Sequence, residues 1–537
     1  MSKQSLLLGT AVLVAAGLFN RILGFIYQIL IIDLIGAKGI GLYNMVFPVY
    51  ILAIVIASAG IPLAVSKFVA AEAGRNNFPG AQRILRVSML FLLGTSVLCT
   101  GLLYWFAPEL KKNIFPNPES YIVFRALLPG ILLISVCSAF RGYFQGLMQM
   151  TPTAVTLVVD QIVRIITGLF FARLLLPHGI AYGAMGSALG LVLGELAGLL
   201  VMLVIYKRYR SQSGPTAYTG PNPGQWKLLT EMLQFSVPVT LSRIVATIIL
   251  SMEATIIPKQ LIIAGATLDE ATSMYGQLTG MAMPILAIPS VLTASLATAM
   301  VPAVSEASSA KQSRLLGERI GESLKVTICA GLPAVVIFYL LPHQLTDLLF
   351  HNPQAGQALK ILAFGGLFYY LQQTTTGILQ GLGRANLPLR NLIAASLLEL
   401  IGLICLVRIP GLGLQGAAWA INISFVVVAV LNLINIANLV GIMVSFKNLI
   451  IIPLAATGVL GLSLKFSYRW FLYHNLSTAW ATLLALGLSG GVYFCLLLIT
   501  GVIDAKSFRR LKFFKVSVPG RLSHLAYGLR RLFSTWK

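Results

Sequence analysis

The chain has 537 residues, of which 57% are hydrophobic and only 10% are charged, and its mean hydropathy is +0.86. This composition excludes an ordinary soluble globular protein and predicts a protein that crosses a membrane many times. The net charge of +23 does not indicate nucleic-acid binding, because most lysines and arginines lie in short connectors and in the C-terminal tail. The positive-inside rule produces that distribution in membrane proteins.

Long apolar stretches recur along the whole chain, and each is long enough to cross a bilayer as a helix. The first continues past Arg21 to Ile35, which is longer than a secretory signal core, so we expect a retained span. Basic residues fill alternate connectors and predict cytoplasmic termini, whereas the intervening connectors contain acids such as Glu109, Glu119 and Asp269. About fourteen spans are expected, at residues 6–35, 42–70, 82–107, 121–147, 153–176, 181–206, 229–257, 273–305, 318–342, 356–382, 388–408, 413–440, 447–466 and 477–503.

Segments of the first half recur in the second half in the same order. GYFQGLMQMTP at 142–152 matches GILQGLGRANLP at 377–388, and PHGIAYGA at 177–184 matches PGLGLQGA at 410–417. Shorter similarities relate IPLAVSK to VPAVSEA and FNRIL to LSRIV. Together they predict two parallel six-helix repeats, related by a pseudo-two-fold axis along the membrane normal, with a substrate site where the halves meet.

The expected organisation follows from this duplication. An N-terminal six-helix lobe at 1–206 is joined by a cytoplasmic linker at 207–228 to a C-terminal six-helix lobe at 229–442. Two extra transmembrane helices at 443–503 have no counterpart in the repeat. The tail at 504–537 is basic with interleaved aromatic residues, and we expect it to lie as an amphipathic helix on the anionic cytoplasmic leaflet.

Two arginines lie inside the expected spans. Arg21 is at mid-depth of the first span, and the repeat places Arg243 at the same depth of the seventh. An arginine at the bilayer centre costs at least about 2.5–3.5 kcal/mol on insertion scales, so both should face protein or water. Each could be a structural arginine satisfied by a buried carboxylate and helix carbonyls. The symmetry favours a pair that meets across the axis, and because guanidinium groups suit phosphate oxygens, we expect an anionic substrate.

The acids inside the spans have several interpretations. Asp160 and Arg164 are four residues apart on one helix, so we expect a structural ion pair. Glu195 and Glu399 lie at mid-depth and could be buried protonated acids, ligands of a coupling cation, or members of further salt bridges. Two other acids lie nearer the outer ends of the first and seventh spans, where water can reach them. The candidate ion-coupling residues are therefore Glu253, Glu399, Glu195 and Asp33.

The second and eighth spans contribute polar side chains that could bind a sugar or peptide head group. They are Tyr43 and Asn44 on the second span, and Tyr275 and Gln277 on the eighth. Interfacial tyrosines and helix-end amides are the alternative interpretation. Prolines interrupt both spans and predict bends there. The sequence has no P-loop, metal-ligand cluster or nucleophile triad, so we expect no enzyme activity, no cofactor and no metal.

Four segments carry a family resemblance. FNRILGFIYQILIIDLIGAKGIGLYNMVFPVY (19–50), GIPLAVSKFVAAEAG (60–74), FRGYFQGLMQMTPTAV (140–155) and MEATIIPKQL (252–261) resemble the stage V sporulation protein B branch of the polysaccharide flippases. That branch is related to the MurJ lipid II flippases within the MOP exporter superfamily, and the resemblance covers essentially the whole chain. It implies two lobes that rock about a V-shaped central cavity, with the last two helices forming a groove for a lipid tail.

The resemblance also implies a cargo and some of its contacts. The cargo would be an undecaprenyl-pyrophosphate-linked saccharide, with lipid II as the first candidate, flipped to the outer leaflet of a bacterial cytoplasmic membrane. We expect the chain to act as a monomer. The arginine of the family's first-helix R-x-L-G-F pattern, which binds the pyrophosphate region, falls on Arg21, and an acid that precedes P-x-x-L in helix seven falls on Glu253. MurJ proteins carry further cavity arginines on helices two and eight, where this chain has Tyr, Asn and Gln.

Three alternative functions stay open at this stage. A cation-coupled multidrug exporter of the same superfamily would have a cavity dominated by carboxylates, whereas this chain has two arginines at mid-depth. A flippase for a polysaccharide other than peptidoglycan would share every feature above. An integral-membrane glycosyltransferase or polymerase would need catalytic carboxylates at the membrane surface, and the outer connectors have no clustered acids.

Overall fold

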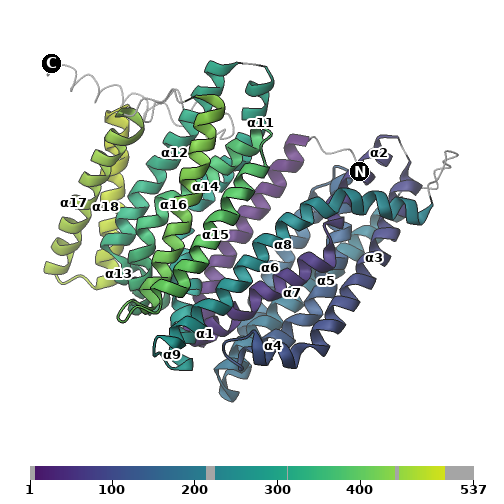
Figure 1. Ribbon diagram of the computed structural model, residues 1–537, viewed down its shortest axis with the longest axis horizontal. Coiled ribbons are helices and arrows are strands. Elements are labelled where there is room, and N and C mark those ends of the chain that lie inside the picture. Colours follow the sequence, from purple (N-terminus) through teal and green to yellow (C-terminus); the bar gives the residue numbers. More distant parts are fainter. Residues whose placement is uncertain (1–5, 76, 213–223, 311, 442–446, 502–537) are drawn as a thin grey trace. The chain divides into compact units, whose positions relative to one another are not determined.

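The computed structural model describes residues 6–75, 77–212, 224–310, 312–441 and 447–501, and the regular secondary structure of these residues is entirely helical (Figure 1). Residues 213–223 of the expected linker and the whole expected tail lie outside the described residues. The α-helices are α1 Leu6–Ser58, α2 Ile61–Gly74, α3 Phe78–Trp105, α4 Ala107–Asn113, α5 Ser120–Gly146, α6 Thr151–Leu175, α7 Ile180–Gln212, α8 Gln225–Ile263, α9 Leu268–Gly276, α10 Met283–Leu286, α11 Ser290–Ser309, α12 Ser313–Leu340, α13 Pro342–Phe350, α14 Gly356–Gly381, α15 Asn386–Leu406, α16 Gly413–Val440, α17 Ile452–Tyr473 and α18 Thr478–Ile499.

The first two expected spans are joined at a single residue. Inside α1, Gly36 has φ 69° and ψ −175°, which divides the helix into two parts at a kink. A residue with a Cβ atom is strained at such a positive φ, whereas glycine is not. The second part ends at Ala59 and Gly60, which also have positive φ, and the chain continues as α2.

The described helices account for the expected spans. Twelve helical stretches of the described residues are long and apolar enough to cross a membrane. The first of them, Val12–Gly74, has 63 residues and contains two expected spans because of the break at Gly36. The tenth expected span coincides with α14, which is more polar because it carries Lys360 and the run 372–376 of glutamines and threonines. The expectation of an all-α protein with many membrane spans is therefore confirmed.

The eighth expected span is not one continuous helix, as its prolines predict. After α9, a π-helical turn at Gln277–Ala282 leads into the single turn of α10, and α11 begins only at Ser290. Pro284 and Pro289 have no amide hydrogen to donate, so they cannot continue an α-helical ladder. The span is thus divided between α9, the irregular segment 277–289 that contains α10, and α11.

The chain packs into two compact units. Unit 1 comprises the chain up to Gly280 together with 403–414, and unit 2 comprises 281–402 and the chain from 415 onward. In unit 1, α8 packs against α1, α2 and α3, and Leu228 and Met232 of α8 lie in the same apolar core as the buried residues of α3 and α5. Unit 2 has its own core, which is formed mainly by α11, α12 and α14. The expected lobes at 1–206 and 229–442 were defined by repeated sequence and not by packing. Their boundaries therefore stay a prediction.

The last two described helices form an antiparallel pair within unit 2. α17 and α18 pack side by side (Figure 1), and the pair contacts α12 and α13. Tyr493 of α18 donates a hydrogen bond to the backbone carbonyl of Cys329 on α12 over 2.9 Å, and Leu460 and Leu497 are buried in the same cluster. The outward faces carry exposed residues such as Leu462 and Phe466, as expected for helices that contact lipid.

Candidate functional site

Arg21 lies at the exposed end of a stripe on α1 that becomes progressively buried. Residues at helical spacing along this stripe are Arg21, which is exposed, Phe25 and Gln28, which are half-buried, and Ile32 and Ile35, which are 2% and 3% exposed. The side chain of Gln28 donates to the carbonyl of Gly280 over 2.7 Å, so this stripe faces the segment that follows α9. α1 thus contacts α9 and the segment after it through residues such as Gln28, Gly41 and Asn44, whereas Ile35 lies near Gly183 of α7.

α8 has the same gradient. Arg243 is exposed, Thr247 one turn later is half-buried, and Ala254, Ile257 and Leu261 are at most 1% exposed. α1 and α8 pack against each other within unit 1. Each arginine thus lies at the exposed end of its stripe, although the amide of Asn20, next to Arg21, still donates to the carbonyl of Leu157 on α6 over 3.0 Å. An arginine inside a membrane span cannot face lipid without compensation. The exposed surface around both arginines is therefore the candidate substrate surface of unit 1.

Three of the four polar residues expected to bind a head group, Asn44, Tyr275 and Gln277, lie at a closed seam between α1 and the α9 segment. Asn44 donates from its amide to the hydroxyl of Thr279 over 3.0 Å, and the hydroxyl of Tyr275 lies 3.5 Å from the backbone oxygen of Asn44. Tyr275 and Gln277 are 3% and 7% exposed. Tyr43 is half-buried and stacks on a neighbouring phenylalanine of α1. Contact of these groups with a substrate requires the seam to open.

A buried cluster of charges joins three helices of unit 1. Arg164 donates to both oxygens of Asp160, with an Nη2 to Oδ2 distance of 3.1 Å, as their spacing on α6 predicts. Glu195 on α7 lies 3.7 Å from Arg164 through one oxygen and 3.7 Å from Arg141 of α5 through the other. Asp160 and Glu195 are 4% and 6% exposed. Two guanidinium groups and two carboxylates neutralise each other, so a desolvated charge of either sign is avoided.

The close approach of α6 and α7 positions this cluster. A Cβ atom on Gly190 would lie 2.3 Å from the backbone of Gly168, and a Cβ atom on Gly194 would lie 2.5 Å from a carboxylate oxygen of Asp160. Small residues at such crossings let membrane helices pack backbone to backbone. The tight contact brings Glu195 within reach of a charge on the neighbouring helix.

The other candidate ion-coupling acids differ in their surroundings. Glu399 on α15 is 6% exposed and lies beside Ser424 of α16, both in unit 2, and no ion pair to it occurs in the described residues. Glu253 on α8 is half-buried and has an interaction partner. Asp33 on α1 is exposed. Among the four acids, Glu399 therefore combines burial with a hydroxyl neighbour and no observed counter-charge.

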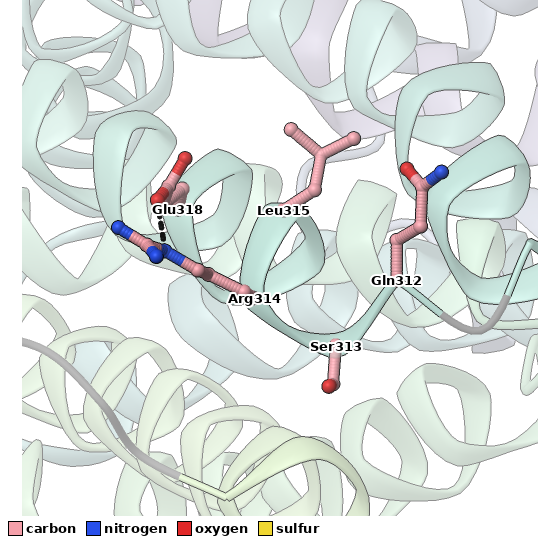
Figure 2. Close-up of a pocket in the computed structure, with 5 residues that line it drawn as sticks. All are labelled: Gln312, Ser313, Arg314, Leu315 and Glu318. Carbon is pink, nitrogen blue, oxygen red and sulfur yellow. Dashed lines mark hydrogen bonds and ion pairs between the residues drawn. The ribbon is translucent and has the colours of Figure 1, made fainter.

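An open hollow at the start of α12 is not part of this arrangement. It has a volume of about 430 Å³ and is lined by residues of one short stretch, Gln312 to Leu315 together with Glu318. Figure 2 shows that its two charged side chains pair with each other, and the Nε of Arg314 lies 3.1 Å from a carboxylate oxygen of Glu318. Both are more than half exposed, so the pair contributes little to stability and leaves no free charge for a ligand.

Comparison with known proteins defines the family. A family model described as "Polysaccharide biosynthesis protein" matches residues 6–308, and a model described as "MatE" matches residues 278–404. Over 515 residues the chain is 31% identical to stage V sporulation protein B of Bacillus subtilis (strain 168), an alignment that covers 95% of this chain and 98% of the relative. The chain belongs to the polysaccharide biosynthesis protein family.

Two further comparisons define the superfamily and the fold of this polysaccharide biosynthesis protein. It is 25% identical over 521 residues to the lipid II flippase MurJ of Bacillus subtilis (strain 168), which covers 91% of this chain and 94% of the relative. The solved structure "Lipid II flippase MurJ, inward closed conformation" superposes with a TM-score of 0.68 at 17% identity, over 90% of this chain and 98% of that one. The protein is a multi-pass membrane transporter of the MOP superfamily, as the sequence resemblance implied.

Two charged residues of this polysaccharide biosynthesis protein were not singled out from the sequence. Arg141 completes the buried cluster, and Lys38 lies between Glu119 and Asp269 at the bend of α1. Arg141 could have been noticed as a cation in a mostly apolar stretch of α5. Lys38 could have been noticed as a basic residue in a connector on the side where the other connectors are acidic.

Proposed function

We propose that the chain flips an undecaprenyl-pyrophosphate-linked saccharide, with lipid II as the first candidate, from the inner to the outer leaflet of a bacterial cytoplasmic membrane. We further propose that it acts as a monomer with both termini in the cytoplasm. The observation that carries the proposal is the position of Arg21 and Arg243, each at the point where a stripe of its helix changes from buried to exposed. The relation to MurJ supports a lipid-linked cargo.

The two arginines would hold the pyrophosphate. A guanidinium group donates a planar pair of N–H groups that matches two phosphate oxygens, and its charge persists at every physiological pH. The polyprenyl tail would stay in lipid beside α17 and α18, which present exposed apolar side chains. Tyr43, Asn44, Tyr275 and Gln277 would contact the head group once the seam has opened.

The energy for transport would come from a cation bound in unit 2 or from the membrane potential. We propose Glu399 as the first candidate for coupling, because it is buried beside a hydroxyl group and has no observed ion pair in the described residues. Glu253 and Asp33 are further candidates at the outer ends of their spans. Glu195 is less suited to bind a cation, since two arginines already neutralise it.

The test is lipid II translocation in bacteria depleted of their own flippase, at matched membrane levels of each variant. The native chain should restore transport, and Arg21→Ala and Arg243→Ala should each lower it about tenfold or more at limiting substrate, because a charge-assisted hydrogen bond contributes roughly 1.5–3 kcal/mol. Arg125→Ala is the matched control, since this exposed arginine on α5 contacts Tyr104 and lies outside the proposed site.

Each outcome has a distinct meaning. If the native chain is inactive on lipid II but moves another polyprenyl-pyrophosphate saccharide, the cargo is a different cell-surface polymer precursor. If both arginine variants transport normally, the arginines are structural and the proposed clamp is wrong. If the native chain instead lowers the accumulation of cationic drugs in a sodium- or proton-dependent way, the multidrug exporter, to which the MatE match at 278–404 is related, is the better description.

A further inference from the structure

The seam between α1 and α9 contains a backbone-to-backbone crossing. A Cβ atom on Gly41 would lie 2.2 Å from the carbonyl oxygen of Thr272, and a Cβ atom on Gly276 would lie 2.0 Å from the carbonyl oxygen of Ala37. Neither helix can therefore carry a larger residue at its crossing point in this arrangement. The two helices can separate as units, but they cannot approach further.

Ion pairs and a hydrogen bond lie next to this crossing. The ammonium of Lys38 is 2.7 Å from a carboxylate oxygen of Asp269 and 3.2 Å from one of Glu119. The side chain of Lys38 is 19% exposed, whereas both acids are about half exposed or more. The amide of Asn117 donates to the hydroxyl of Thr272 over 2.9 Å. Three segments are thus tied together, namely the bend of α1, the turn before α5, and the start of α9.

These segments come from different sequence repeats. The bend of α1 and the turn before α5 belong to the first repeat, and α9 belongs to the second. A transporter of this superfamily has to separate such contacts on one side of the membrane at a time. Partly exposed ion pairs suit a contact that must break in every transport cycle. Each pair contributes little free energy, and water can solvate both charges when the pair separates.

We propose that Lys38, Glu119 and Asp269 form a latch that holds the outer end of the transport pathway shut, and that the glycine crossing is the surface on which it closes. The latch opens when the α9 segment moves away from the bend of α1, which also frees Asn44 and Tyr275. This inference rests on the proposed transport from the inner to the outer leaflet, for which the seam has to open, and does not depend on the identity of the cargo.

Cysteine labelling tests the latch without any cargo. In a chain whose five native cysteines are replaced, Thr272→Cys places a thiol at a position that is 0% exposed while the seam is closed. Open membrane fragments expose both sides to a hydrophilic maleimide, so the orientation of the chain does not affect the result. Lys38→Glu turns two attractions into two repulsions and should raise the labelling rate about fivefold.

Two controls accompany this variant. Lys111→Glu makes the same charge change at an exposed lysine of α4 and should leave the labelling rate unchanged. Adding Asp269→Lys to Lys38→Glu reverses the ion pair and should return labelling toward the native rate. A general loss of folding would instead raise the labelling rate of both Lys38→Glu and the double variant. The charge swap therefore distinguishes a specific latch from simple destabilisation.

A steric variant tests the crossing independently of charge. Gly41→Ala adds a methyl group that fits only if α1 and α9 move apart, so it should raise the labelling of Thr272→Cys as Lys38→Glu does. Gly17→Ala on the same helix is the matched control, because nothing lies within 4 Å of the added atom. If neither Lys38→Glu nor Gly41→Ala raises labelling above its control, the latch is refuted whatever the cargo.

A reversible cross-link connects the latch to transport. A short thiol-specific cross-linker between Lys38→Cys and Asp269→Cys should abolish transport of whichever substrate the native chain moves, and reduction should restore it. A cross-link between Glu109→Cys and Asn113→Cys, which lie on one turn of α4, should leave transport unchanged. Continued transport by the fully cross-linked first pair would overturn the proposal. If the labelling results hold while lipid II is not moved, the latch stands and only the proposed cargo fails.

Discussion

Replacing Glu195 by glutamine should destabilise the protein, because it leaves the guanidinium of Arg141 buried without a carboxylate. The side chains of Glu195 and Arg141 are 8% and 17% exposed, whereas Arg164 would keep Asp160 at 3.1 Å. Removing one partner of a buried pair costs about 3–5 kcal/mol. Both contacts of Glu195 are 3.7 Å long and glutamine preserves the volume, so we expect a loss of about 2–3 kcal/mol in the free energy of unfolding.

The assay is reversible unfolding in mixed micelles with increasing sodium dodecyl sulfate, followed by tryptophan fluorescence. The double variant Arg141→Gln with Glu195→Gln removes both charges and should be about 1–3 kcal/mol more stable than Glu195→Gln alone. Arg125→Gln, an exposed arginine on the same helix as Arg141, should stay within about 0.5 kcal/mol of the native chain. An unchanged stability of Glu195→Gln, or a double variant less stable than this single one, would refute the reasoning.

Two further predictions concern unit 2 and the α9 segment. Tyr370→Phe removes the hydrogen bond that the fully buried hydroxyl donates to the carbonyl of Leu286 over 2.7 Å, and the same unfolding assay should detect a loss of about 1–3 kcal/mol, because the buried carbonyl loses this donor. The pKa of Glu270 lies below its usual range because the backbone N–H and the hydroxyl of Thr267 donate to its carboxylate in a capping box. A lowered pKa stabilises the folded state above the unfolded-state value of about 4.3, and the contribution disappears as the pH falls through the folded-state value. Hydrogen exchange of α9 should therefore accelerate as the pH falls through this range, after correction for intrinsic rates, and Thr267→Ala should weaken that dependence.

The sequence predicts contacts within one helix more readily than contacts between helices. Asp160 and Arg164 are four residues apart, a spacing that brings two side chains together on any α-helix, so their pairing follows from the sequence alone. Arg141 reaches Glu195 only because α5, α6 and α7 pack together, and no spacing rule contains that information. Hydropathy predicts the spans and places a connector between the first two at 36–41, but it does not reveal that the helix is broken at the single residue Gly36.

The polar seam illustrates the same limit. The sequence indicates Asn44 and Tyr275 as polar residues of the second and eighth spans that could bind a head group, with an interfacial tyrosine and a helix-end amide as the alternative. The structure brings them against each other, because Gly41 lets the two helices approach to backbone contact. Whether such groups meet a ligand or one another depends on the conformational state, and a single sequence carries no information on which state is populated.

The interrupted eighth span has a mechanical consequence. The boundary between the two compact units falls at Gly280, inside the π-helical turn at Gln277–Ala282 and shortly before Pro284 and Pro289. Where the chain first passes from one unit to the other, it does so through irregular backbone in the middle of a span rather than through a surface loop. We expect such a segment to bend more easily than a continuous helix, because its α-helical hydrogen-bond ladder is interrupted. Substitutions that straighten it should therefore slow the transport cycle more than they change the free energy of unfolding.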